Sequence, residues 1–155
     1  MGISALLSAL TAIQASLVVP ANTVEAQPDP IKIVHAYEYT PPQSVGGLHT
    51  PCWTNEWTLI GAPRSPSLQE TMYDIRMMLY IEDSEVDRGA KIANAFFDQF
   101  LLKLGENLTL SGSIHHHELT GGTPTGVIWT WGNLSYTGLD LHLAATTKEV
   151  ATFGA

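Results

Sequence analysis

Cysteine is almost absent from this chain of 155 residues, since Cys52 is the only one. A single thiol can form no disulfide within the chain and cannot supply a cysteine-based metal motif, so we expect a protein of a reducing compartment. His49 lies three residues before Cys52, but catalytic Cys–His pairs usually meet through the fold, and Pro51 and Trp53 form no recognisable nucleophile motif around the thiol. We therefore interpret Cys52 as a structural thiol.

Basic residues are also scarce. Seven Lys and Arg stand against fifteen Asp and Glu, which gives a net charge of −8. A domain that grips nucleic acid needs clustered Lys and Arg, so the composition excludes that class, although it is compatible with an acidic wall that faces DNA without holding it. Charged residues make up only 14% of the chain, against about 25% in a typical soluble domain. We expect neighbouring subunits to cover part of the surface.

Long apolar runs are missing as well, because no unbroken stretch reaches the ~18 residues that a membrane helix needs. Residues 5–19 resemble the apolar part of a signal peptide and residues 24–26 a cleavage site, but the first basic residue is Lys32, so the charged leading segment is absent. Leu6 occupies the position at which a myristoylation signal after Gly2 requires Ser or Thr. We expect one unprocessed domain over residues 1–155 and no membrane contact.

The centre of the chain is a predicted strand and helix over residues 71–105. Large apolar residues alternate along 71–81, which is the period of a half-buried strand: Tyr73, Ile75, Met77, Leu79 and Ile81. The spacing then becomes helical, with a shared face of Ala93, Phe96, Phe97, Phe100, Leu101 and Leu104. Ser84 is a suitable N-cap and Gly105 a suitable end. We predict that this helix covers one face of a sheet.

An amphipathic helix is predicted over residues 3–18, ended by Pro20. Its apolar stripe consists of Ile3, Leu6, Leu7, Leu10, Ile13 and Leu17. The predicted outer face is small and uncharged, with Ser8, Thr11 and Gln14, which is unusual for a helix in water and indicates contact with other chains. We interpret residues 20–30 as a linker and residues 40–51 as a long loop of functional or interfacial type.

Further strands are predicted at 31–39, 53–60, 108–117, 127–131 and 136–145. Between them we expect a Gly- and Pro-rich loop at 119–126, and after them a flexible C-terminal arm at 146–155. Strands grouped into runs indicate an antiparallel sheet with helices on one face. The predicted fold class is α+β, a mostly antiparallel sheet with two principal helices packed on it in a single domain.

Histidines form the most conspicuous candidate site. His115 and His117 would share one face of a strand, so that His142 or Glu118 could complete a zinc or nickel site. A closed site needs three or four ligands, and no second His/Cys pair is close in sequence, so a polar strand end is the preferred interpretation. Helix capping explains the acid pairs near residue 84. The Gly pairs are not phosphate-binding loops, because no phosphate-loop lysine follows them. The Trp pairs lack the neighbouring basic residues of a base-stacking platform. We expect neither enzymatic activity nor a cofactor.

Four segments together carry a family resemblance: the small-residue helix at 4–13, the turn Tyr37-Glu-Tyr-Thr-Pro-Pro42, the helical stretch Ala-Asn-Ala-Phe-Phe-Asp-Gln-Phe-Leu at 93–101, and a closing aromatic and Gly-containing strand at 132–143. In this order they resemble the layout of the tail terminator proteins of long-tailed bacteriophages, small virion subunits that cap the tail tube. The resemblance covers nearly the whole chain.

The resemblance implies a structural virion protein without catalytic residues, assembled in the host cytoplasm into a homohexameric ring at the head-proximal end of the tail. Such a ring ends polymerisation of the tail tube protein, receives the head-side connector or stopper protein, and lets DNA pass through its lumen without specific binding. Interface candidates in the first helix and the 40–51 loop are Leu6, Leu10, Thr11, Gln14, Tyr39, Pro41, Pro42, Val45 and Leu48. The alternatives are another neck or head-completion subunit, a metal-binding module built on His115, His117 and His142, and a small secreted domain that has lost about its first 26 residues.

Overall fold

A computed structural model gives the structure of the protein and describes residues 2–39, 50–64, 68–82, 86–107, 116–131 and 134–150. The chain begins with helix α1 (Ile3–Ala15) and three two-residue strands, β1 (Val18–Val19), β2 (Ile31–Lys32) and β3 (His35–Ala36). The long elements then follow in the order β4 (Cys52–Gly61), β5 (Leu68–Ile81), α2 (Val86–Glu106), β6 (His116–Trp131) and β7 (Leu134–Val150).

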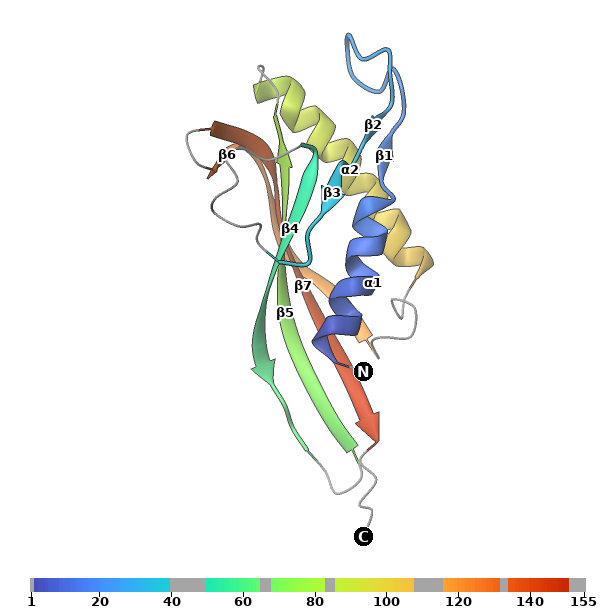
Figure 1. The fold of residues 1–155 in the computed structure, drawn as a ribbon, viewed down its shortest axis with the longest axis vertical. Helices are drawn as coiled ribbons and strands as arrows, with labels where there is room; N and C mark the ends of the chain where they lie inside the picture. Colours follow the sequence, from blue (N-terminus) through green and yellow to red (C-terminus); the bar gives the residue numbers. More distant parts are fainter. Residues whose placement is uncertain are drawn as a thin grey trace.

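The main sheet has the strand order β3-β4-β5-β7-β6. Its four long strands pair antiparallel, whereas β3 runs parallel to β4. Both helices lie on one face of this sheet (Figure 1), with α1 against β3 and β4 and α2 against β5, β6 and β7. A separate small sheet pairs β1 with β2. The predicted α+β fold class is therefore confirmed.

The predicted strand and helix at 71–105 form the middle of the hydrophobic core. Odd-numbered residues of β5 (73–81) and of β7 (139–145) are buried on the helix side, because successive residues of a strand point to opposite faces. From α2, Phe96 and Phe100 are fully buried, and the Phe100 ring centroid lies 5.4 Å from that of Trp53 on β4. The strand is three residues longer than predicted and continues to the predicted end at Ile81.

The buried face of α2 differs slightly from the predicted one. Leu101 is 42% exposed, and Ile92, which the prediction did not include, is buried. The most deeply buried side chains follow a spacing of four residues from Ile92 through Phe96 and Phe100 to Leu104, one ridge of the helix, and Leu101 lies beside that ridge. The predicted N-cap Ser84 lies outside the described residues.

Helix α1 is confirmed, but one of its predicted outward residues is buried. Leu6, Leu7 and Leu10 have no exposed surface, as predicted for the apolar stripe, and neither has Gln14. Gln14 lies one turn after Leu10 on the same face, and it exchanges two hydrogen bonds with the Asn55 side chain. The prediction that Gln14 faces outward is therefore wrong. This buried amide pair fixes α1 against β4.

Residues 20–30 form an ordered loop rather than the predicted linker. The buried Gln27 holds the loop together, since its Oε1 accepts hydrogen bonds from the backbone N–H groups of Thr23 and Val24 at 3.1 Å. Its Nε2 donates to the carbonyls of Pro20 and Asp29 at 2.9 and 2.8 Å. The Pro-rich composition suggested a linker. It could not reveal that the side chain of Gln27 folds back and forms hydrogen bonds within its own loop.

Three further predictions, of a strand, a loop and an arm, also need correction. Residues 31–39 are not one strand, since β2 pairs with β1 and β3 pairs with β4, and the chain changes sheets between them. The expected loop at 119–126 is part of the continuous strand β6. Residues 146–150 belong to β7 and pair with β5, so the predicted flexible arm does not begin at 146; residues 151–155 lie outside the described residues.

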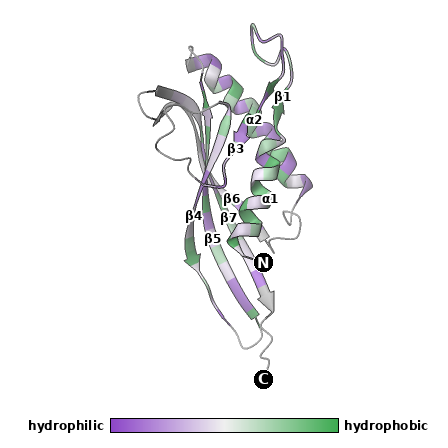
Figure 2. Cartoon of the chain, in the orientation of Figure 1, coloured by the Kyte–Doolittle hydropathy of each residue, from purple (hydrophilic) through white to green (hydrophobic). Residues whose placement is uncertain are grey.

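The far end of β4 extends past the helices (Figure 1). We call residues 57–60 the β4 tip. Trp57 and Leu59 are 41% and 52% exposed on the helix side, and Ile60, at the irregularity in the register between Leu59 and Gly61, is 58% exposed. The end of this strand is coloured hydrophobic in Figure 2. Within the described chain, β5 is the only strand that pairs with the tip.

Candidate functional site

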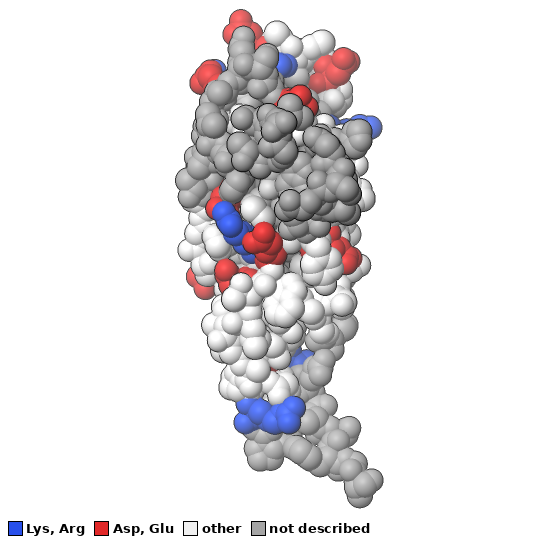
Figure 3. Space-filling view, turned by 60° about the vertical axis from the view of Figure 1, so that its left-hand side comes forward, with Lys and Arg blue, Asp and Glu red and all other residues white. Residues whose placement is uncertain are grey.

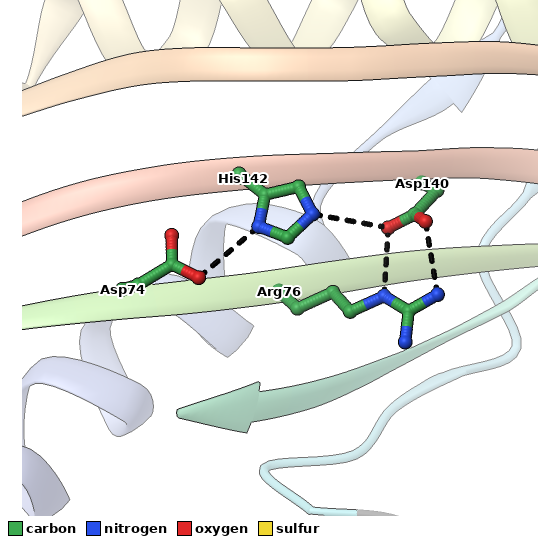
Figure 4. A network of polar contacts seen from close by, with 4 residues as sticks. All are labelled: Asp74, Arg76, Asp140 and His142. Atoms are coloured by element: carbon green, nitrogen blue, oxygen red, sulfur yellow. Dashed lines mark hydrogen bonds and ion pairs between the residues drawn. The ribbon is translucent and has the colours of Figure 1, made fainter. Parts of the chain in front are cut away.

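A chain of four polar residues crosses β5 and β7 on the face away from the helices (Figure 4). Arg76 donates two hydrogen bonds to Asp140, from Nε to Oδ1 at 3.0 Å and from Nη2 to Oδ2 at 2.9 Å. His142 lies between two carboxylates, with Nδ1 at 3.1 Å from Asp74 Oδ2 and Nε2 at 3.8 Å from Asp140 Oδ1. Because the four residues lie on neighbouring, directly paired strands, the sheet register brings them together.

The geometry of this network favours a structural role over catalysis. In hydrolytic triads, one imidazole nitrogen is held by a carboxylate and the other contacts the nucleophile. In His142 both nitrogens face carboxylates, so neither is directed at a nucleophile. The hydrogen bonds to Asp140 raise the pKa of Arg76 above its usual value, so the guanidinium remains charged.

The face that carries the network is acidic. By register, Glu56, Glu70 and Glu118 also point to the side away from the helices. With Asp74 and Asp140 they make five carboxylates, against Arg76 and Lys148 as the basic residues placed there by the same register. Lys148 is itself paired with Glu70 at 3.6 Å. The described part of this face therefore has an excess of negative charge.

The end of the same face near β3 is apolar instead. Cys52, Met78, Tyr80 and Tyr136 form a second buried cluster there, with Tyr37 packed against it. Burial raises the pKa of the Cys52 thiol to about 12 and is also the main cause of a raised pKa at Tyr80. A thiol with so high a pKa is not a nucleophile near neutral pH, which agrees with the structural interpretation of Cys52.

Two of the three candidate metal ligands, His117 and His142, lie within the described residues, and they do not come together. His117 is paired with Ala145, whose side chain is buried on the helix side, whereas His142 lies in the network on the opposite face. The sheet therefore separates these two imidazoles. His115 lies outside the described residues, and the described ones contain no group of three His, Cys, Asp or Glu that could hold a metal ion.

The predicted interface residues have different positions in the structure. Leu6, Leu10 and Gln14 are buried within their own chain, so the proposal that they contact a neighbour is wrong for this conformation. Thr11 is partly buried and its hydroxyl donates to the Ser8 carbonyl at 3.0 Å. Tyr39 is 50% exposed, so its side chain is accessible to a neighbouring subunit. The other four candidates, Pro41, Pro42, Val45 and Leu48, lie outside the described residues.

Two apolar surfaces were missed from the sequence. The first is the β4 tip. The alternation of side chains along this strand was visible in the sequence. The point at which the helices stop covering the strand was not, because it depends on how α1 and α2 cross the sheet. The second is a cavity of about 270 Å³, which we call the α2–β6 pocket. Its lining comes from α2, β6 and β7: Phe97, Leu119, Thr120, Gly121, Gly122, Leu139 and Leu141.

Charged side chains are sparse around the β4 tip. Figure 3 brings the β4 side of the molecule forward, and its lower part is mostly neutral, with basic groups near the lower limit.

Among the described residues, no helix is both long and apolar enough to cross a membrane.

Comparison with models of known protein families finds no match to this sequence. Comparison with curated proteins finds no similar sequence either.

Proposed function

We propose that this protein is a structural subunit of a bacteriophage tail, which forms a ring on the tail tube, ends its polymerisation and joins the tail to the head-side connector. The α+β layout supports this proposal, since two helices cover one face of a mostly antiparallel sheet in the order on which the family resemblance rests. The low content of charged residues, 14%, supports a subunit whose surface is partly covered by neighbours.

The observation that carries the proposal is the β4 tip. A sheet normally buries its apolar face against another layer. Trp57 and Leu59 project from the helix side of β4 where the helices no longer cover them, and the neighbouring Ile60 is also exposed. Exposed apolar groups that lie next to each other are typical of interaction sites. The tip is therefore suited to be covered by another subunit.

The acidic face supports the passage of DNA through a ring. Its excess of carboxylates would repel the phosphate backbone, so DNA would move past the face without adhering to it. The proposal places this face toward the lumen. A ring structure with Asp74 and Asp140 on the outside would remove this part of the argument.

Other functions have less support. The His142 network lacks the geometry of a catalytic base, and His117 and His142 lie on opposite faces of the sheet. A secreted form that had lost its first 26 residues would also lose Leu6, Leu7 and Leu10 from the core.

The test combines solution mass with binding to tail tubes. The purified chain should form a particle of about six copies, as the family resemblance implies, and electron microscopy should show it at one end of assembled tubes. Binding to the head-side connector without binding to tubes would indicate a different neck subunit. A stable monomer that binds neither would refute the proposal.

A further inference from the structure

The α2–β6 pocket has the size and lining of a site for apolar side chains. Its volume of about 270 Å³ lies below the range of roughly 300–1,000 Å³ that is typical of small-molecule sites. Leucine and phenylalanine side chains supply most of the lining, and Thr120, Gly121 and Gly122 at the rim are exposed. A pocket of this kind accepts an apolar group from outside more readily than a polar metabolite.

Glycine keeps one side of the pocket open. A Cβ atom at Gly122 would lie 2.5 Å from Leu141 Cδ2, so any larger residue would force Leu141 to move. Leu101 lies one helical turn after Phe97 and is 42% exposed, so the apolar surface continues along α2 beyond the pocket.

The β4 tip lies at the other side of the same sheet. In the strand order β3-β4-β5-β7-β6, β6 is an edge strand, and past Trp53 β4 has a free edge within the described chain. The pocket is on the β6 side, and the exposed Trp57 and Leu59 are on the β4 side. Both surfaces open on the helix side of the sheet, because Leu139 and Leu141 point there, as do Trp57 and Leu59.

We propose that the β4 tip of one copy of this chain docks Trp57 and Leu59 into the α2–β6 pocket of a second copy. The occupant is a copy of the chain because the apolar donor and the apolar acceptor occur on one molecule at opposite sheet edges, in a protein with few charged residues. Contact between two different surfaces is head-to-tail, and it forms a ring when the rotation closes. The inference rests on the proposed ring and specifies its subunit contact.

Cysteine cross-linking tests the contact directly. One chain carries Leu59→Cys and a second carries Thr120→Cys at the rim of the pocket; both positions are exposed, whereas the native Cys52 is fully buried. After mild oxidation, the mixture should give a mixed disulfide dimer, and each chain alone should give none. A chain with both substitutions should give a ladder of cross-linked species. Val34→Cys, at a 57% exposed site, replaces Leu59→Cys as the matched control and should not cross-link to Thr120→Cys.

A disulfide formed by Leu59→Cys alone would overturn the inference, because it would indicate that two β4 tips meet each other. Absence of the mixed disulfide from an oligomeric preparation would also overturn it, while leaving the ring intact. A mixed disulfide from a protein that never binds tail tubes would support the contact and refute the proposed function.

Charge substitution gives an independent measurement. Leu59→Asp should raise the protein concentration needed for assembly at least tenfold, as followed by native mass spectrometry. The midpoint of thermal unfolding of the isolated subunit should change by no more than a few degrees. Leu102→Asp is the control, since Leu102 is 61% exposed on α2 and does not line the pocket. Equal weakening by both substitutions would contradict a specific role of the β4 tip.

Discussion

Replacing Asn55 by leucine should destabilise the fold through the polar groups that remain. The Gln14 and Asn55 amides exchange two hydrogen bonds of 2.9 Å, and Asn55 Nδ2 also donates to the Tyr37 carbonyl at 2.7 Å. Asn55→Leu leaves the buried Gln14 amide and the Tyr37 carbonyl without these partners. At about 1–3 kcal/mol for each buried polar group, we expect a loss of about 3 kcal/mol. The midpoint of thermal unfolding should fall by roughly 10 °C.

The double variant separates the amide pair from general damage to the core. Gln14→Leu combined with Asn55→Leu removes both amides, so its loss should be at least about 2 kcal/mol smaller than the sum of the two single losses. Urea unfolding of the four proteins measures this coupling, and Ser8→Ala on the exposed side of α1 should stay within about 0.5 kcal/mol of the parent. Additive losses, or a harmless Asn55→Leu, would show that the pair does not fix α1 on the sheet.

The remaining predictions concern the core, the pocket and the buried thiol. Phe100→Ala should cost about 3–5 kcal/mol in urea unfolding, because the ring is fully buried against Trp53; a loss under 1 kcal/mol would contradict the packing. Gly122→Ala should cost about 1–3 kcal/mol by displacing Leu141, whereas Gly105→Ala in the last turn of α2 meets no atom within 4 Å and should be neutral or stabilising. Above pH 9 the unfolded thiol ionises, while burial keeps the folded Cys52 protonated up to a pKa of about 12. Stability should therefore fall as pH rises through this range, by up to about 1.4 kcal/mol per pH unit, with a shallower fall in Cys52→Ala.

The strand–helix unit at the centre could be predicted because its pattern is local. Alternation from Tyr73 to Ile81 and the helical spacing through Phe96 and Phe100 each follow from one element packing on one layer. Gln14 shows the limit of such reasoning. It lies on the apolar stripe, but only the partner amide of Asn55, 41 residues later, makes its burial favourable.

Context from the sheet explains the missed strands. Residues 119–126 contain glycine and proline, yet β6 is an edge strand, where proline is tolerated, and Gly122 leaves space for Leu141 on the neighbouring strand. Residues 146–150 appeared too polar for a core strand, but they pair with the start of β5, where the sheet extends beyond most of its helix cover. The two apolar surfaces that support assembly arise from the placement of whole elements, which local patterns do not specify.

The mass of the native particle in solution is the most direct test of an assembly role. It should be measured by native mass spectrometry on the unmodified chain, alone and with Leu59→Asp. We expect a closed particle of about six copies for the unmodified chain and smaller species for the variant. A chain that remains monomeric at all concentrations, with the same mass in both forms, would contradict it.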